Sequence, residues 1–307
     1  MEASPRRTRL QRKQLEVTTK ETDRPLPTSA TSATGTSTDP VLVEESYHQS
    51  GQPSKPWSPP QTLTKLNKAD YKLLLRKQEL LRRDEISIPK SFHKHTSAVS
   101  ATLVFSQEEA GTAICIRPDG LLLTCSHCIA ETADELDKNK LHWLLFASGQ
   151  VVSAKCVAWD PTRDLALLQV VAAGSNLKTD AHEFPSVSVA EQPPLLNEPL
   201  VCVGHPGSED LEAVEAGVKT NYDVLHVSTG AYRGIAEGQD VQDNSEIGAL
   251  KHDCWTYWGH SGAPLLSRRS GQLVGLHSSW DDTTGMRRGV PLEAIQGFLV
   301  ENGNGEN

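Results

Sequence analysis

From residue 97 onward the sequence alternates between short apolar runs and clusters of turn-forming residues, and this pattern constrains the fold more than any other feature. Twelve such runs occupy residues 97–105, 111–117, 121–126, 141–146, 151–159, 165–171, 199–204, 223–229, 249–253, 264–267, 273–279 and 286–291. Gly, Pro, Asp and Asn separate them, as in Arg117-Pro118-Asp119-Gly120, and these residues favour tight turns. Many short strands with few helices are typical of a sandwich or a barrel. We therefore predict an all-β domain over residues 96–302.

A helix is expected on each side of this domain, the later one at about 291–302. In the earlier one, apolar side chains and one lysine approximate a single stripe over residues 66–84: Leu66, Leu73, Leu74, Lys77, Leu80 and Leu81. This spacing predicts an amphipathic helix with Asn67 as its N-cap, and Pro89 prevents the helix from continuing. The helix lies inside a helix-and-linker segment at 63–95. The helix could dock on the domain or on a second copy of the chain, and a simple linker helix is the alternative.

Residues 1–62 are rich in Ser, Thr and Pro and poor in large apolar side chains. Burial cannot offset the entropy of ordering such a segment, so we predict a disordered, basic tail. Its start, Arg6-Arg7-Thr8-Arg9, is compatible with a nuclear signal or a mitochondrial presequence, and a solvated tail is the simpler interpretation. The start lacks the apolar core of a secretory signal, which predicts an intracellular protein, in the cytoplasm or nucleus ahead of the mitochondrion.

Charge and cysteine content argue against several classes of protein. The net charge is −9 and the acidic excess lies in residues 97–307, so nucleic acid is not an expected partner. No run approaches the roughly 18 apolar residues of a membrane-spanning helix. The six cysteines are expected to be reduced, because no secretory signal is present. Cys125, His127 and Cys128 cluster, as do His252 and Cys254, but structural zinc favours four ligands in separated pairs. We expect no metal and no cofactor.

Three motifs each bring one reactive side chain to the end of an apolar strand. Residues 122–128 lead from a strand through small residues to His127. Residues 160–170 put Asp164 at the mouth of a strongly apolar strand, with Asp160 as a turn residue, and a carboxylate buried there needs a partner. Residues 259–266 surround Ser261 with small residues. A serine hydroxyl needs an adjacent base, histidine suits neutral pH, and a buried carboxylate fixes the histidine tautomer, so the set predicts nucleophilic catalysis.

These motifs resemble T-A-A-H-C, D-[IL]-A-L-L and G-D-S-G-G-P of the chymotrypsin/trypsin superfamily, in the same order. Residues 111–113, 118–124, 153–164 and 272–276 look most like its HtrA/Deg branch, but no PDZ module is expected here. The resemblance covers about 97–300, with 172–250 matched only loosely. It implies two six-stranded antiparallel barrels, at about 97–190 and 197–292, with the active site between them.

The resemblance also implies roles for individual residues. His127, Asp164 and Ser261 would form the catalytic triad, and the backbone N–H groups of Gly259 and Ser261 would form the oxyanion hole. The strand at 277–279 would pair with the substrate backbone. Further substrate-binding side chains would come from this strand and from two tryptophans: Trp255, Trp258, His277, Ser278 and Ser279. Because Trp255 stands at the expected pocket floor, cleavage after Lys or Arg is not expected.

The sequence departs from the family pattern close to the nucleophile. His260 stands where digestive enzymes have an Asp that pairs with a new N-terminus, so activation by that ion pair is not expected. Ala263 replaces a glycine, and Cys128 lacks a disulfide partner at the expected position near Thr112. We predict an intracellular serine endopeptidase that forms an acyl-enzyme on protein or peptide substrates. The alternative is a latent or non-catalytic protein that binds peptides or partners, and a homo-oligomer through the 66–84 helix is possible.

Overall fold

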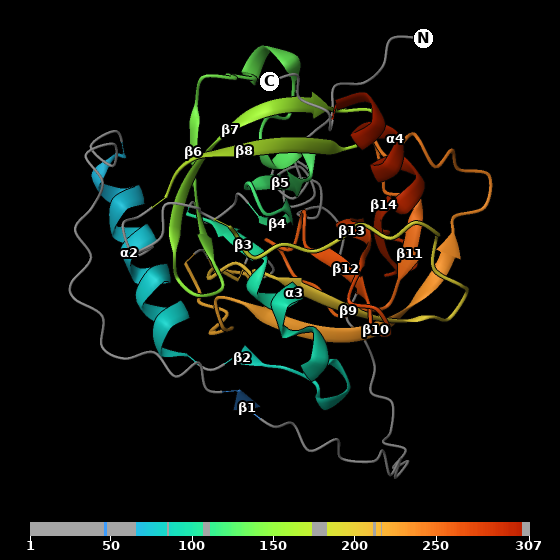
Figure 1. Cartoon of the computed structure of the whole chain (residues 1–307), viewed down its shortest axis with the longest axis horizontal. Helices are drawn as coiled ribbons and strands as arrows, with labels where there is room; N and C mark the ends of the chain where they lie inside the picture. Colours follow the sequence, from blue (N-terminus) through green and yellow to red (C-terminus); the bar gives the residue numbers. More distant parts are fainter. Residues whose placement is uncertain are drawn as a thin grey trace, which may run out of the picture. The chain divides into compact units, whose positions relative to one another are not determined.

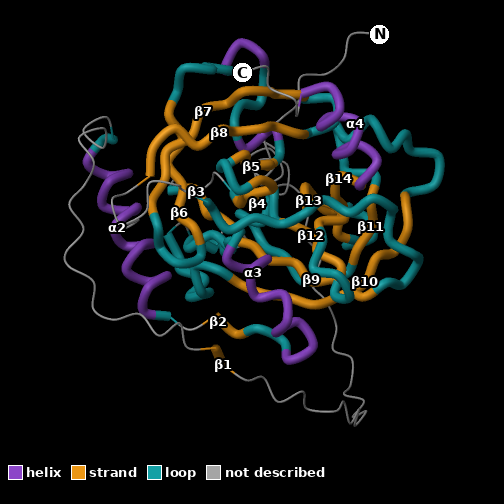
Figure 2. Tube along the Cα trace, in the orientation of Figure 1, coloured by secondary structure: helices purple, strands orange, loops and turns teal. Residues whose placement is uncertain are grey.

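The computed structural model describes residues 46–47, 66–84, 86–106, 111–173, 183–210, 213–215 and 217–302. These residues belong to one compact unit, Glu45–Asn307. Two closed, six-stranded antiparallel barrels dominate it (Figure 1), and loops connect most of their strands (Figure 2). The expected all-β class and the two-barrel architecture are confirmed.

The first barrel carries two of the three motifs at one of its ends. Its strands are β3 (Thr102–Phe105), β4 (Thr112–Arg117), β5 (Leu121–Thr124), β6 (Leu141–Phe146), β7 (Val151–Asp160) and β8 (Leu165–Ala173), in the closed order β3-β4-β5-β8-β7-β6. The antiparallel register pairs Thr124 with Ala166 and Leu123 with Leu167. The chain that leaves β5 therefore lies beside the chain that enters β8. This register brings the His127 and Asp164 motifs together although 37 residues separate them.

The second barrel carries the third motif in the loop before the strand β12 and in the first residues of that strand. Its strands are β9 (Pro199–Gly204), β10 (His226–Ile235), β11 (Leu250–His252), β12 (Pro264–Ser267), β13 (Leu273–Trp280) and β14 (Arg287–Pro291), in the closed order β10-β11-β14-β13-β12-β9. One apolar core includes Leu103 and Leu123 of the first barrel as well as Val203 and Leu276 of the second. Burial of a single such side chain contributes about 1.5–3 kcal/mol, so this shared core holds the barrels together.

The helices at the borders of the domain are confirmed. α2 (Lys68–Arg83) has Asn67 as its N-cap, whose side chain accepts a hydrogen bond from the Asp70 N–H at 2.9 Å. Of the alternatives for this helix, the structure has it packed on its own domain, with Leu74 and Leu81 in the core. α4 (Leu292–Asn302) follows β14. No helix among the described residues is long and apolar enough to cross a membrane.

Two strand predictions were wrong at their starts. The run 97–105 begins as a helix, α3 (Thr96–Ser100), which follows the 3-10 helix η2 (Lys90–His95). A helical hydrogen bond from Ala101 N–H to the Ser97 carbonyl and burial of the adjacent Ala98 and Val99 outweigh the alternating pattern. The run at 223–229 becomes strand only at His226 and continues to Ile235.

Part of the predicted tail and three short segments complete the description. The tail lies outside the described residues except for β1 (Ser46–Tyr47), which pairs antiparallel with β2 (Ile86–Ser87). Two residues of the predicted disordered tail are therefore in a strand. The 3-10 helices η3 (Ser126–Cys128) and η4 (Ala133–Glu135) lie between β5 and β6, and η3 holds His127.

Candidate active site

His127 lies in a single 3-10 turn that directly follows β5. The turn is closed by hydrogen bonds from Cys128 N–H to the Cys125 carbonyl and from Ile129 N–H to the Ser126 carbonyl. Trp159 of β7 fixes it from outside, because its indole N–H donates to the Ser126 carbonyl at 3.1 Å. The turn thus holds the His127 ring at the barrel end with 27% of its side chain exposed.

Asp164 lies at the turn from β7 to β8 and adopts a left-handed backbone conformation, with φ at 54°. Asp160 builds this turn, since its Oδ1 accepts the N–H groups of Thr162 and Arg163 at 2.9 and 3.0 Å. Asp160 was predicted as a turn residue; it is the last residue of β7, and its side chain caps the turn that follows. Asp tolerates a left-handed backbone better than most residues, and the apolar Leu165 that follows is fully buried. The turn aims the Asp164 carboxylate inward, where 3% of the side chain is exposed.

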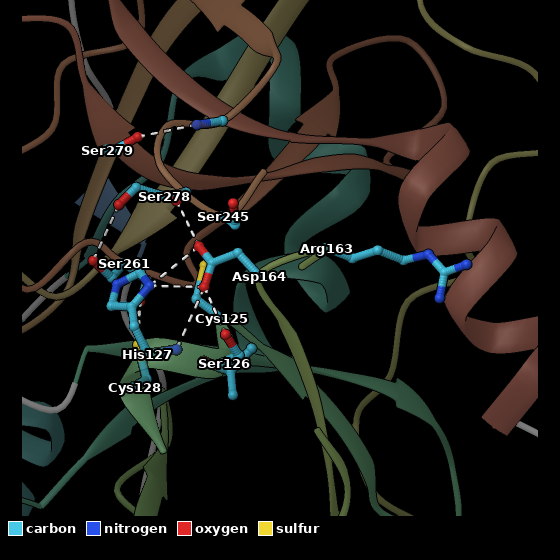
Figure 3. A network of polar contacts seen from close by, with 12 residues as sticks. Cys125, Ser126, His127, Cys128, Arg163, Asp164, Ser245, Ser261, Ser278 and Ser279 are labelled. Carbon is cyan, nitrogen blue, oxygen red and sulfur yellow. Dashed lines mark hydrogen bonds and ion pairs between the residues drawn. The ribbon is translucent and has the colours of Figure 1, made fainter. Parts of the chain in front are cut away.

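The Asp164 carboxylate accepts hydrogen bonds from three side chains (Figure 3). Ser278 Oγ donates to Oδ2 at 2.7 Å, Ser126 Oγ donates to Oδ1 at 2.9 Å, and His127 Nδ1 lies 2.9 Å from Oδ1. Burial opposes ionisation of this group, but the charge of His127 and these hydrogen bonds outweigh it and lower the pKa of Asp164 to about 2. The group is therefore ionised at neutral pH.

An ionised carboxylate only accepts hydrogen bonds, so His127 Nδ1 must carry the proton in this pair. In the neutral imidazole, Nε2 then has the free lone pair. Figure 3 shows the Ser261 side chain beside the imidazole, on the side away from Asp164. The Ser261 hydroxyl donates a hydrogen bond to the Ser278 carbonyl at 3.4 Å. The structure thus brings the three predicted residues together, with the histidine between the carboxylate and the serine, as a general base requires.

The loop that carries Ser261 has its carbonyl groups fixed on surrounding segments. Gly207 N–H donates to the Trp258 carbonyl at 2.6 Å, and Ala263 N–H donates to the His260 carbonyl at 2.8 Å. In a trans peptide the N–H points opposite to the C=O. The N–H groups of Gly259 and Ser261 belong to these same two peptide groups, so both are held pointing away from those partners. Among the described residues, neither N–H donates a hydrogen bond within the protein. This arrangement suits an oxyanion hole.

Thr112 of β4 anchors the same loop from the other barrel. Its N–H donates to the Ser261 carbonyl at 2.8 Å, and its Oγ1 donates to the Gly259 carbonyl at 3.1 Å. Gly259 and Gly262 have φ values of 97° and 81°, a region that favours glycine. A Cβ on Gly262 would lie 2.1 Å from the Thr112 carbonyl oxygen. The small residues around Ser261 are therefore required by close contact with the first barrel.

The predicted substrate-binding strand, 277–279, forms part of β13. Its side chains do not share one role. Ser278 donates a hydrogen bond to Asp164, and Nδ1 of the buried His277 ring is hydrogen-bonded to His252 Nε2 at 3.0 Å. Ser279 Oγ accepts the Gly248 N–H at 3.3 Å. The register slips between His277 and Ser279. In the described part of the chain, β12 pairs with β13 only as far as Leu276, so no strand pairs with residues 278–280 on the edge opposite β14.

The predicted tryptophans lie in two different clusters. Trp258 and Trp280 meet edge to face with ring centroids 4.5 Å apart. Trp255 packs instead on Tyr222 and His226, with centroid distances of 5.1 and 4.7 Å. The two predicted pocket residues, Trp255 and Trp258, therefore pack against different aromatic partners.

The cysteines around His127 are free thiols. Gly111, next to Thr112, faces Cys128, because a Cβ on Gly111 would lie 2.8 Å from the Cys128 Sγ. Donor atoms of Cys125, His127 and Asp164 lie within 4.8 Å of one another. Hydrogen bonds from Ser126 and Ser278 already occupy the carboxylate, and burial raises the pKa of the Cys125 thiol well above its ordinary value. The chemistry of this group suits a hydrogen-bonded His–Asp pair better than a metal site.

Residues 111–276 match the profile of the trypsin-like peptidase domain, which is more than half of the chain. The chain belongs to the trypsin-like peptidase family. Solved structures similar to it include the Rv3671c protease of M. tuberculosis in its active form, with 18% identity and a TM-score of 0.48 over 69% of this chain and 85% of that chain. A serine endoprotease from Yersinia pestis has 18% identity and a TM-score of 0.46 over 67% of this chain and 65% of that chain. No curated protein sequence matches significantly.

Three site residues of this trypsin-like domain were not predicted in their observed roles. Ser126 and Ser278 donate to Asp164, and Thr112 anchors the Ser261 loop. Ser126 had a local signal, since it directly precedes His127 in an apolar context. Ser278 was predicted to bind substrate, and its contact with Asp164 was visible only once both barrels were assembled.

Proposed function

We propose that this protein is a serine endopeptidase with His127, Asp164 and Ser261 as its catalytic triad. The observation that carries the proposal is the His127 ring, which lies between the ionised Asp164 and the Ser261 hydroxyl (Figure 3). Membership of the trypsin-like peptidase family supports peptide-bond hydrolysis as the reaction.

In this proposal the Nε2 atom of His127 takes the proton of Ser261 Oγ as that oxygen attacks the scissile carbonyl. The negative charge that develops on the carbonyl oxygen is stabilised by the N–H groups of Gly259 and Ser261, and loss of one such donor typically costs about 3–4 kcal/mol. His127 then protonates the leaving amine, which yields an acyl-enzyme on Ser261. Water deprotonated by His127 hydrolyses this ester. Asp164 keeps the Nδ1–H tautomer throughout and stabilises the imidazolium.

The open edge of β13 supports an extended peptide as the substrate. Residues 278–280 would pair with the substrate backbone by β-augmentation, which places the scissile bond against Ser261. The predicted segment 277–279 is shifted by one residue, because the N–H and carbonyl of His277 already bond to Ala263 and Gly262. The six free thiols support a reducing, intracellular compartment, as reduced cysteines are the rule there.

A fluorophosphonate probe tests the triad, because it phosphonylates only an activated serine. Purified protein is expected to label and to cleave internal bonds of a peptide library. Ser261→Ala and His127→Ala should lose both properties, with far-UV circular dichroism unchanged. Labelling that persists in Ser261→Ala would refute the assignment.

One observation favours a second function, peptide binding without hydrolysis. The rings of Trp258 and Trp280 are in contact beside the Ser261 loop and the open edge of β13. A latent protein of this kind would leave the probe unreacted. It would bind peptides with the same affinity in the wild type and in Ser261→Ala.

A further inference from the structure

α2 is fastened to the first barrel by two buried polar side chains that are neighbours in the sequence. Lys77 is 3% exposed and donates from Nζ to the Phe105 carbonyl at 2.9 Å. Gln78 is 4% exposed and donates from Nε2 to the Gly149 carbonyl at 2.8 Å. The two contacts are alike in burial and length. They differ in the segment to which each carbonyl belongs and in how directly hydrogen bonds connect that segment to the Ser261 loop.

Beyond the Lys77 contact, a short path of hydrogen bonds reaches the Ser261 loop. Phe105 is the last residue of β3, and its N–H donates to the Gly111 carbonyl at 3.2 Å. Gly111 is followed directly by Thr112, which holds the carbonyl groups of Gly259 and Ser261. The Lys77 ammonium therefore fixes the end of the hairpin that anchors the proposed oxyanion hole.

The other barrel holds the same loop through His205. Burial, and then the charge of Lys77, lowers the pKa of His205 well below its ordinary value. The His205 N–H donates to Thr112 Oγ1 at 3.0 Å. Gly259 packs against the His205 carbonyl, since a Cβ on Gly259 would lie 2.4 Å from that oxygen.

We propose that Lys77 is a positioning residue for the oxyanion hole, which makes α2 a structural part of the active site. This inference rests on the proposed peptidase function. Lys77 touches no reacting atom. It acts through the Phe105 carbonyl, and the hairpin held there shares with the His205 segment the task of keeping Thr112 and Gly259 in place. The path from Gln78 to the Ser261 loop is less direct, because Gly149 lies in the turn between β6 and β7 and its N–H donates to the Phe146 carbonyl of β6.

The test compares Lys77→Met with the matched control Gln78→Met in the full-length chain. Each variant loses a buried hydrogen bond to a backbone carbonyl, and Lys77→Met also loses a charge, so urea unfolding of both variants accompanies the kinetic comparison. Removal of one oxyanion donor lowers kcat by roughly 10²–10³, so a loosened donor in Lys77→Met should lower kcat at least about tenfold, with KM within about twofold. Gln78→Met should keep kcat within about twofold of wild type.

Two more variants and a second readout keep the test independent of folding and of catalysis. Lys77→Arg keeps the charge and the donors and should recover most of kcat. Lys77→Gln keeps a donor without the charge and covers the case in which Lys77→Met does not fold. Amide hydrogen exchange of residues 257–262 should accelerate in Lys77→Met and not in Gln78→Met.

Equal loss of kcat in Lys77→Met and Gln78→Met, or unchanged kcat and exchange in Lys77→Met, would overturn the positioning role. Failure of the proposed function looks different. Wild-type protein that neither cleaves peptides nor labels with the fluorophosphonate contradicts the peptidase, while the exchange comparison still decides whether Lys77 holds the loop.

Discussion

At the scale of single residues, Asp164 concentrates most of the polar contacts of the site. Its pKa falls from 3.8 to about 2, because hydrogen bonds and the charge of His127 outweigh burial. A carboxyl group with a lowered folded-state pKa stabilises the fold above its unfolded pKa, and that stability is lost as pH falls toward the folded value. The shift corresponds to about 2 kcal/mol at neutral pH.

Asp164→Asn is therefore expected to have two effects. The amide cannot hold the Nδ1–H tautomer of His127, so kcat should fall by roughly 10⁴. The free energy of unfolding should also fall at neutral pH, and the gap to wild type should narrow as pH drops from about 4, near the unfolded pKa, toward the folded pKa of about 2. Urea unfolding at several pH values measures this gap.

Asp160 supplies the control for this experiment, since it is the other acid of the motif. Its Oδ1 accepts backbone N–H groups, and an Asn side chain can do the same. Asp160→Asn should keep kcat within about tenfold of wild type. An Asp160→Asn loss as large as that of Asp164→Asn would mean that the triad assignment is wrong.

The residue types of the site could be predicted from the sequence, but several of their contacts could not. His127, Asp164 and Ser261 each stand in a local motif, and these motifs are readable one at a time. The hydroxyl donors to Asp164 come from residues 38 positions before it and 114 positions after it. No local pattern joins such positions, because only the closed barrels bring them together.

At the scale of elements, α2 illustrates how burial divides two neighbouring leucines. Leu74 is fully buried in the core, whereas Leu75 is 36% exposed. Leu74→Ala should lower the free energy of unfolding by about 2–5 kcal/mol, because it deletes buried methyl groups and leaves a cavity. Leu75→Ala should change it by no more than about 0.5 kcal/mol. Equal effects in urea unfolding would contradict the docking of α2 on its own domain.

Sequence periodicity was enough to predict α2 and most of the strands, but it did not predict the helix α3. Residues 97–105 are apolar or small throughout, so their spacing does not separate a buried helix from a buried strand. Tertiary packing decides between the two, since Ala98 and Val99 of the helical turn are buried in the core. Docking of α2 on its own domain was one of three sequence alternatives. The oligomer through this helix stays a prediction, and it would have to use the face that α2 leaves exposed.

At the scale of the whole molecule, the site exists only where the barrels meet. The first barrel supplies His127 and Asp164, the second supplies Ser261, and one apolar core runs through both. Arg163, next to Asp164, points toward α4 and connects the turn between β7 and β8 to this helix (Figure 3). Its guanidinium donates to both carboxylate oxygens of Glu301 on α4, at 2.7 and 2.8 Å, and to Gln242 Oε1 at 2.8 Å.

The ion pair between Arg163 and Glu301 predicts a different loss of stability when each partner is replaced. Glu301 is 54% exposed on its side chain, so Glu301→Ala should lower the free energy of unfolding by less than about 1 kcal/mol. Arg163 is 19% exposed and also binds Gln242 and Asp160, so Arg163→Ala should cost about 1–3 kcal/mol. Salt screens exposed charges, so urea unfolding in about 1 M NaCl should abolish the Glu301 effect and keep most of the Arg163 effect. If both effects vanish in salt, Arg163 acts through surface charge alone, and its hydrogen bonds to Gln242 and Asp160 do not stabilise the turn that carries Asp164.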